Sequence, residues 1–476
     1  MAATVAGVLR QFGTAYLTEH TLSTPQAKAW RAIVACRTGA LGGDRLACDA
    51  CGHSQWHYHS CRNRHCPQCG TRAKDAWLQA RLAQVLDVPY AHMVFTLPHS
   101  LNALYGAHPR WVIDTLFACV AQTLSEFAAN PRWLGGQAAF TLVLHTWGQA
   151  LQRHVHVHAV IACGGLAADH DGGTDQWVQP TRSPEFLFPV TALSTVFRGK
   201  FMAALQAAHE YGEIANDPQR ANVDWAKRHQ ALYRYNWVVY AKTPLGGPAQ
   251  VLEYLARYTH RTAISNERIV KIEADQVTFK VRADDQGGKR IVKFDGVEFV
   301  RRFLLHVLPT GLKRIRHYGL LAPSKAQSLA HAREQMQMPQ SNPVALELAQ
   351  DFMRRVAQVD LYQCLSLLPA WSAALGGNSQ GLQDLTGAGG AQRDHAAMHG
   401  AAMTAQNASM GWVFDVAGLH RQGAHCAQRR ERLVLGVPPP SFAMAPCHEN
   451  RILRQRSSAK RLNGAPEPEI QTYNTL

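Results

Sequence analysis

Hydrophobic and polar residues alternate most strictly at residues 154–158, where the sequence reads HVHVH. In an extended strand, side chains two residues apart point to the same face. His154, His156 and His158 are therefore predicted to project from one face of a strand, with Val155 and Val157 buried on the other. The apolar run AVIACGG follows directly, which predicts that the strand continues into the protein core.

The rest of the pattern predicts helices and strands in mixed order. Helical periodicity predicts helices within the first forty residues and near 73–88, 101–129 and 188–208. Short apolar or alternating runs predict strands at 91–97, 140–147, 237–242, 276–283 and 289–294. Asp295 and Glu298 resemble a capping box that opens a helix through Phe303. Together these elements predict an α+β fold: a central antiparallel sheet that carries the histidines, with helices on its faces.

The length of 476 residues predicts two or three domains. We expect an N-terminal helical segment at 1–45, a small cysteine-rich domain at 46–75 and a larger domain at 76–325 that carries the histidine strand. From 326 to 476 the chain becomes rich in Ala, Gly, Gln and Ser and ends in basic clusters. This composition predicts a low-complexity, largely disordered basic tail.

The chain is basic, with 49 Lys and Arg against 34 Asp and Glu and a formal net charge of +15. Such a surplus favours a polyanionic partner such as DNA, although a soluble protein can also simply be basic. No apolar run approaches the ~18 residues of a membrane span, and the N-terminus lacks the pattern of a signal peptide. We therefore expect a cytoplasmic protein with no membrane partner.

The domain expected at 46–75 contains a cysteine cluster, which predicts that this domain binds zinc. Five of the eleven cysteines lie between residues 48 and 69, in CDACGHSQWHYHSCRNRHCPQCG. Two CxxC pairs can each aim two thiolates at one tetrahedral zinc ion, which would supply folding energy. The predicted ligands are Cys48, Cys51, Cys66 and Cys69, and Cys61 or His65 could substitute for one of them.

The histidine face of the predicted strand could hold a second metal. Imidazoles in strict alternation lie at chelating distance, and a divalent ion held with open positions can polarise a phosphate. Because sequential strands usually pair, His145 in the preceding strand could be a further ligand or a buried core histidine. The alternative for the whole face is a solvated, histidine-rich strand.

Two tyrosines follow in the segment AQVLEYLARYTHR. On a helix, Tyr254 and Tyr258 would lie on one face, where they could also be ordinary core aromatics. Arg257 and Arg261 accompany them, and cations there would favour a phenolate and bind phosphate. Further along, LKRIRHYG contains a basic group predicted to contact the DNA backbone, consisting of Lys313, Arg314 and Arg316.

These motifs together resemble the rolling-circle transposases of the insertion-sequence-91 family, part of a wider group of nucleases with a His-hydrophobic-His strand and a tyrosine helix. The similar pieces are CRNRHCPQCG, VFTLPH, LHTWGQ followed by HVHVH, FRGKF, WVVYAKTPLGGPAQVLEYLARYTHRTAISNERI and RRFLLHVLPTGLKRIRHYG. They span roughly residues 30 to 321. The family usually has proline where this chain has Val155.

The resemblance implies that 76–325 is an endonuclease domain, and it also implies roles for individual residues. His156 and His158 match the family's metal pair, and the third ligand is open between His154 and His145. The ion would be Mg or Mn by family analogy. Tyr254 and Tyr258 match the tyrosines that attack DNA phosphorus to form a 5′-phosphotyrosyl link.

The implied function is a transposase that nicks and rejoins single-stranded DNA at element ends and target sites, associated with the bacterial nucleoid. A plasmid rolling-circle replication initiator or a relaxase would use the same catalytic pieces. A different class, a non-catalytic zinc-dependent DNA-binding protein, would leave the His and Tyr residues with structural roles only.

Overall fold

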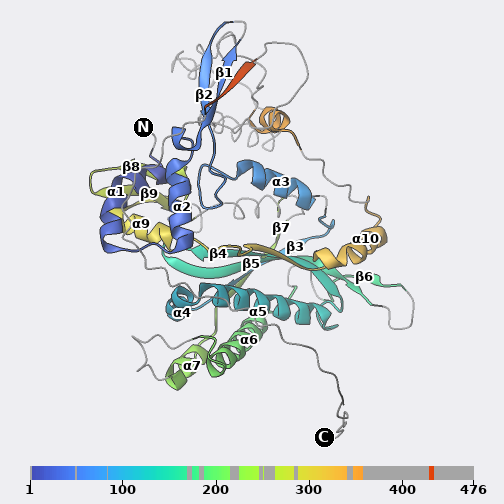
Figure 1. The fold of residues 1–476 in the computed structure, drawn as a ribbon. Helices are drawn as coiled ribbons and strands as arrows, with labels where there is room; N and C mark the ends of the chain where they lie inside the picture. The colour runs from blue at the N-terminus through green and yellow to red at the C-terminus, as the bar shows by residue number, and fades with distance from the viewer. Residues whose placement is uncertain are drawn as a thin grey trace, which may run out of the picture. The chain divides into compact units, whose positions relative to one another are not determined.

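The computed structural model, shown in Figure 1, describes most of the first 357 residues and one later strand. The described residues are 3–48, 51–82, 84–168, 174–181, 187–214, 225–245, 250, 263–282, 288–339, 347–357 and 428–433.

A six-stranded antiparallel sheet, the main sheet, forms the centre of the fold. Its strand order is β11-β4-β5-β3-β7, and β6 adds to β5. The strands are β3 (Tyr90–Thr96), β4 (Gln137–Trp147), β5 (Arg153–Ala167), β6 (Gln176–Val178), β7 (Val239–Leu245) and β11 (Ile315–Gly319). The predicted α+β fold with a central antiparallel sheet is thus confirmed, and the HVHVH run lies in β5, at the centre of this order.

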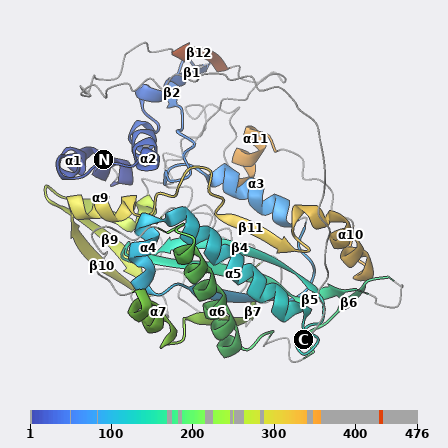
Figure 2. The same ribbon diagram turned by 60° about the horizontal axis from the view of Figure 1, so that its bottom comes forward.

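Helices cover one face of the main sheet. They are α4 (Asn102–Ala107), α5 (Pro109–Ala129), α6 (Val190–Glu210) and α7 (Trp225–Tyr233). Figure 2 shows α5 and α6 side by side along this face. Val155 and Val157 of β5 pack into the core between sheet and helices, as the alternation predicts. The histidines of the same run therefore face away from these helices.

Helix α5 is the single helix within the described residues that is long and apolar enough to cross a membrane, with a mean hydropathy of 1.3. The sequence analysis predicted a helix within 101–129 but no apolar run long enough for a membrane. Its apolar side chains, including Ile113, Leu116 and Phe117, are fully buried against the main sheet. A core position therefore accounts for its composition.

A second core joins the N-terminal helices to a later part of the chain. Helices α1 (Val5–Glu19) and α2 (Thr24–Ala35) share it with a three-stranded sheet and helix α9 (Gly296–Leu304). The strands of this sheet are β8 (Ile269–Ile272), β9 (Gln276–Arg282) and β10 (Lys289–Asp295). The predicted cap of α9 is present, since the Asp295 carboxylate accepts from the backbone amides of Val297 and Glu298.

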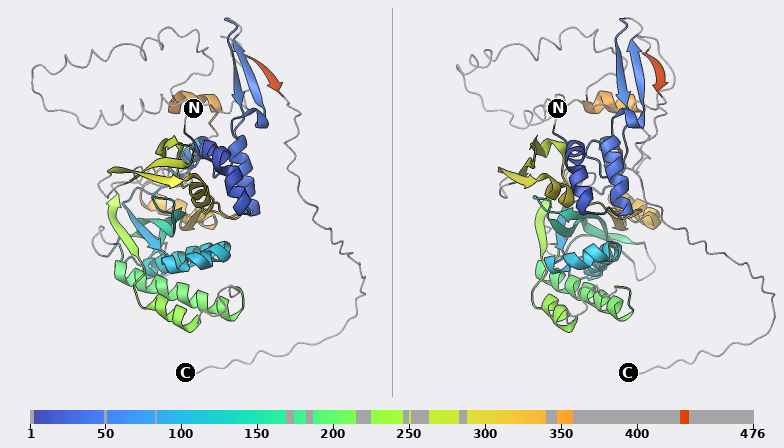
Figure 3. Two further views of the ribbon diagram at one scale, coloured as in Figure 1. Left: turned by 90° about the vertical axis from the view of Figure 1, so that its left-hand side faces the viewer. Right: turned by 60° about the vertical axis from the view of Figure 1, so that its left-hand side comes forward.

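The opposite face of the main sheet is partly covered by α3 (Thr71–Leu82) and α10 (Ala326–Gln335). Helix α10 begins at the residue where the tail was expected to begin, and its Ala332 is fully buried. A short helix, α11 (Ala349–Phe352), follows. Figure 3 shows the remaining sheet, the hairpin of β1 (Gly43–Cys48) and β2 (Ser54–Tyr58) with β12 (Gln428–Leu433) beside β1.

Gly319 at the end of β11 provides a test of the fold. Its φ is +57°, and a Cβ there would lie 1.8 Å from the carbonyl oxygen of Ala138 on β4. We expect Gly319→Ala to lower the free energy of unfolding by more than the ~1–2 kcal/mol of a left-handed backbone alone, because β11 must also move. The measurement is chemical denaturation followed by circular dichroism.

Gly311→Ala is the matched control, because Gly311 also has a positive φ of +76° but only the tip of Arg110 nearby, at 3.9 Å. Equal destabilisation by the two variants would contradict this account of β11.

Candidate active site and zinc cluster

The pairing of β4 with β5 brings three histidines together on the face of the main sheet that points away from α5 and α6. We call it the open face, because α3 and α10 cover only part of it. His145 of β4 is the cross-strand partner of His156, and His158 lies two residues further along the same face. The imidazoles of His145, His156 and His158 offer ligand atoms that all lie within 4.8 Å of one another. All three side chains are buried.

Hydrogen bonds orient the ring nitrogens of His156 and His158. His156 Nδ1 lies 2.9 Å from the carbonyl oxygen of His154, which can only accept, so Nδ1 carries the proton and Nε2 presents its lone pair. His158 Nδ1 lies 2.9 Å from His92 Nε2 on β3. If Nδ1 of His158 donates to His92, its Nε2 is likewise left to bind a metal.

The donor set fits a divalent metal ion. His156 Nε2 and His158 Nε2 are 3.1 Å apart, close to the ~3.0 Å separating two nitrogens bound at right angles about 2.1 Å from one ion. Burial, with a smaller contribution from His154, lowers the pKa of His156 to about 4. The imidazole is therefore neutral near pH 7, as a metal ligand must be.

His154 lies outside this group. Its ring is half-buried, and its Nδ1 lies 3.1 Å from His99 Nε2. Between the two candidates for the third ligand, the geometry therefore favours His145.

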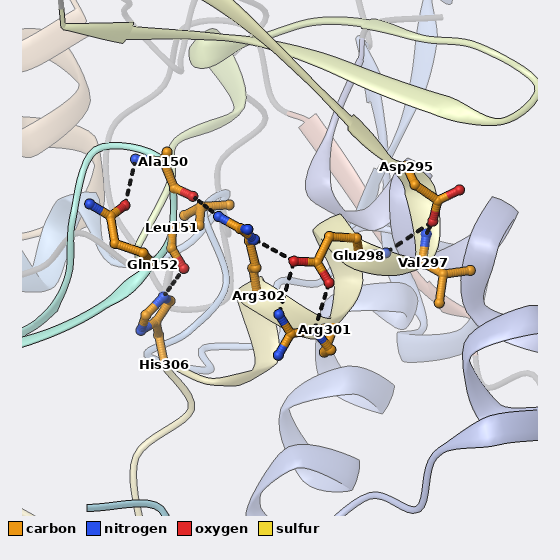
Figure 4. A network of polar contacts seen from close by, with 9 residues as sticks. All are labelled: Ala150, Leu151, Gln152, Asp295, Val297, Glu298, Arg301, Arg302 and His306. Carbon is orange, nitrogen blue, oxygen red and sulfur yellow. Dashed lines mark hydrogen bonds and ion pairs between the residues drawn. The ribbon is translucent and has the colours of Figure 1, made fainter. Parts of the chain in front are cut away.

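The turn between β4 and β5, residues 148–152, is held by the region around α9 (Figure 4). Arg302 donates to the carbonyl of Ala150 at 3.1 Å, and His306 Nε2 donates to the carbonyl of Leu151 at 3.0 Å. Glu298 in turn pairs with Arg302 at 2.6 Å. The turn fixes which residues of β4 and β5 face each other, so these contacts also fix the pairing of His145 with His156.

Leu151 adopts an unusual backbone conformation in this turn. Its φ is +60°, a left-handed geometry that costs a residue with a side chain about 1–2 kcal/mol. The side chain is fully buried in the core shared with α1 and α9. Burial of a leucine side chain contributes a similar amount, about 1.5–3 kcal/mol, and offsets the strain.

A cysteine cluster lies between α2 and α3. The thiols of Cys36, Cys61, Cys66 and Cys69 all lie within 4.8 Å of one another. Cys69 Sγ is 3.5 Å from Cys36 Sγ and 3.6 Å from Cys61 Sγ. Four thiolates around a tetrahedral zinc at 2.3 Å are about 3.8 Å apart, so the cluster fits zinc closely.

This set differs from the predicted ligands. Cys66 and Cys69 are in the cluster, together with Cys61, which was considered as a substitute. Cys36, which the sequence analysis passed over, takes the remaining position, whereas Cys51 is exposed.

The β1–β2 hairpin explains the difference. Its strands pair from Gly43 opposite Tyr58 to Ala47 opposite Ser54, so the pair Cys48 and Cys51 belongs to the tip. At about 3.4 Å per residue, the tip is about 17 Å from the base of the hairpin. Cys36 and Cys61 flank that base, where Arg37 N donates to His59 O at 3.0 Å.

Known proteins show clear similarity to this chain. A protein-family model described as a transposase zinc-binding domain matches residues 8–97. A second family model, described as a putative transposase, matches residues 139–328. Putative transposase y4qJ of Sinorhizobium fredii is 42% identical over 370 residues, covering 76% of this chain and 92% of the relative. This chain belongs to the insertion-sequence-91 family of transposases.

A second relative of this transposase is the transposase for insertion sequence element IS801 of Pseudomonas savastanoi pv. phaseolicola. It is 25% identical over 345 residues, covering 70% of this chain and 79% of the relative. A solved structure, the metal-bound conjugative relaxase TrwC with OriT DNA, is 14% identical and covers 55% of this chain and 96% of that chain, with a TM-score of 0.21.

The sequence relatives settle two predictions. The chain is a rolling-circle transposase and therefore an enzyme that acts on DNA. It also contains a zinc-binding domain, to which the cysteine cluster belongs.

His65, a possible substitute zinc ligand, has another role in the transposase. Its Nε2 accepts from the backbone amide of Leu308 at 3.2 Å, and its Nδ1 faces the side-chain oxygen of Asn63 at 3.2 Å. The neighbouring Arg64 donates to the carbonyl of Leu312 at 2.6 Å. The cysteine cluster is thereby tied to residues 308–312, which lead into β11.

The predicted DNA-contacting group 313–316 lies partly inside the fold, because β11 is a strand of the main sheet. Arg316 is paired with Asp114 of α5. Arg314 stacks over Trp147 at 5.0 Å, and burial lowers its pKa to about 10. Lys313 is exposed and accessible to a phosphate.

The remaining predicted site residues are Tyr254, Tyr258, Arg257 and Arg261, which lie outside the described residues. Trp147, which the sequence analysis did not single out, stacks on the ring of His145 at 4.8 Å. The sequence could have indicated this contact, because Trp147 lies two residues after His145 in the same strand and therefore on the same face.

Zinc content should separate the two cysteine sets. We expect about one zinc per chain in the wild type, and substantial loss in Cys36→Ser because one of four thiolate ligands is removed. Cys51→Ser is the matched control and should retain zinc. Elemental analysis of the purified proteins is the measurement, and zinc loss in Cys51→Ser but not in Cys36→Ser would restore the original ligand prediction.

Stability should fall in mild acid. Burial lowers the pKa of His306 to about 4, from an ordinary value of 6.5. Below about pH 6.5 His306 becomes protonated in the unfolded chain, whereas in the folded chain it stays neutral down to about pH 4. The free energy of unfolding therefore decreases as the pH falls through this window.

The effect of His306 alone is on the order of 3 kcal/mol. In thermal unfolding measured from pH 7 to pH 4, His306→Gln should start less stable but lose less stability with pH. An identical pH slope for the variant and the wild type would refute this.

Proposed function

We propose that this transposase cleaves and rejoins single-stranded DNA at the ends of its element on the open face of the main sheet. The observation that carries the proposal is the convergence of three buried imidazoles, from His145, His156 and His158, on one point of that face. A divalent ion held there would act as a Lewis acid on the scissile phosphate.

Other groups of the protein orient the metal ligands and attack the phosphate. His154 O and His92 fix the ring orientations of the two β5 ligands. The phenolate oxygen of Tyr254 or Tyr258 attacks phosphorus, and the bond from phosphorus to the 3′-oxygen breaks. The products are a 5′-phosphotyrosyl link and a free 3′-hydroxyl. Rejoining reverses these steps with a second 3′-hydroxyl.

We propose Mg or Mn as the physiological ion. Of the two, three imidazoles favour Mn, because Mg strongly prefers oxygen ligands. For the zinc-binding domain, we propose Cys36, Cys61, Cys66 and Cys69 as the ligands.

Three basic residues are proposed to bind the DNA backbone. They are Lys313, which is exposed, and Arg257 and Arg261, which accompany the tyrosines in sequence. A protein with this substrate is expected at the nucleoid, in the cytoplasm.

The test is cleavage of labelled single-stranded DNA carrying the element's end, with Mg or Mn, scored as a covalent adduct on a denaturing gel. We expect His156→Ala and His158→Ala to slow adduct formation by roughly a hundredfold or more, since metal assistance contributes several kcal/mol. The double variant Tyr254→Phe with Tyr258→Phe should form no adduct.

Matched controls are His20→Ala at the end of α1 and Tyr211→Phe at the end of α6, which should behave as wild type. Binding of the strand by wild type with no adduct, on either strand and with either metal, would favour a non-catalytic DNA-binding protein.

A further inference from the structure

Exposed large apolar side chains, three of them tyrosines, are concentrated in the segment 233–240, which connects α7 to β7 and enters β7. Tyr233, Tyr235, Val238 and Tyr240 are 41%, 46%, 63% and 53% exposed, respectively. In the same segment Trp237 and Val239 are buried in the core behind the main sheet. The alternation therefore anchors the segment on one side and presents large apolar groups to solvent on the other. Exposed apolar groups gathered in this way commonly mark a binding surface.

Tyr240 lies on the same face of the main sheet as the three histidines. Val94 of β3 pairs with Tyr240 on one side and with His158 on the other. Cross-strand partners point to the same face, and two strand spacings amount to about 10 Å. In the described part of the chain, β7 is the last strand of the sheet on this side. The tyrosine therefore stands at the rim of the candidate metal site.

Tyr235 is linked to the histidine strand through a chain of contacts. Its hydroxyl lies 3.2 Å from Ser100 Oγ, and the adjacent His99 contacts His154 at 3.1 Å. The carbonyl of His154 in turn orients His156. The aromatic segment thus lies beside the histidines at Tyr240 and is connected to His156 from Tyr235 through residues 99, 100 and 154.

Arg198 of α6 holds the segment in place. Its Nη1 donates to the carbonyls of Tyr233 at 3.3 Å and Tyr235 at 2.9 Å, and to the Asn236 side-chain oxygen at 3.2 Å. Helix α6 packs beside β7, as Figure 2 shows. A surface already fixed before binding loses little conformational entropy when a ligand arrives.

We propose that the segment 233–240 is a stacking platform for unpaired bases of the single-stranded DNA substrate, next to the phosphate that is cut. The proposal rests on the proposed function of the histidine face. Aromatic rings stack on any base, and nearby cations such as the exposed Arg234 favour the backbone. At about 3.4 Å per stacked base, 10 Å places the ring of Tyr240 within about three nucleotides of the scissile phosphate. The ring face, not the hydroxyl, carries the binding.

The experiment measures the affinity of full-length, zinc-loaded protein for the dye-labelled strand that it cleaves, by fluorescence anisotropy without added Mg or Mn and at fixed ionic strength. We expect Tyr240→Ala to weaken binding by about 5- to 150-fold, the range for loss of one stacked base. Tyr240→Phe should restore most of the affinity. Tyr211→Ala is the matched control, because Tyr211 is 82% exposed but lies at the end of α6.

A second arm places single abasic sites along the strand. One abasic position near the cut should weaken binding to wild type and remove the difference between wild type and Tyr240→Ala, because the two changes delete the same contact. Unchanged affinity in Tyr240→Ala overturns the platform, as does a loss that no abasic position cancels. A change in oligomeric state with unchanged DNA affinity would instead assign this surface to a second copy of the chain.

The two proposals can fail separately. A wild type that forms the covalent adduct while Tyr240→Ala binds normally overturns the platform alone. A wild type that binds the strand with the predicted Tyr240 dependence but forms no adduct overturns the cleavage chemistry alone. A wild type that binds no single strand overturns both.

Discussion

The carbonyl groups of Ala150 and Leu151 accept hydrogen bonds from Arg302 and His306, and these contacts hold the turn that joins β4 to β5. Side chains alternate between faces along a strand, so a slip of one residue between β4 and β5 would turn His145 toward the opposite face. The convergence of the three histidines therefore depends on a turn that is stabilised from outside the main sheet. The strained backbone of Leu151 is maintained by the same surroundings.

The zinc cluster extends this dependence to the other side of β4. Arg64 and His65 lie between Cys61 and Cys66 in the sequence, and both bind the backbone of residues 308–312. That segment leads into β11, which pairs with β4. Free energy released by zinc binding can therefore stabilise the strand beside the histidine site, although the zinc itself takes no part in the chemistry.

Local periodicity was sufficient to predict the histidine strand, because alternation is a property of adjacent residues. The α+β class, the cap at Asp295 and the positions of four of the six strands of the main sheet followed in the same way. The cluster of Cys36, Cys61, Cys66 and Cys69 could not be predicted in this way, because the relation between Cys36 and Cys61 depends on how the hairpin between them closes. The pairing of Arg316 with Asp114 was not predicted either, because it depends on the pairing of β11 with β4. The expected contact of Arg316 with DNA stays a prediction. Contacts distant in sequence determined each of these outcomes.

Helix α5 has a consequence for how the protein is made. It leaves the ribosome before β4 and β5, the strands that cover its apolar side, and before α6, which packs beside it. At about 5–20 residues per second, β5 takes seconds to follow. During that interval a helix apolar enough for a membrane is uncovered on the nascent chain, so chaperones or targeting factors have time to bind it before the sheet forms.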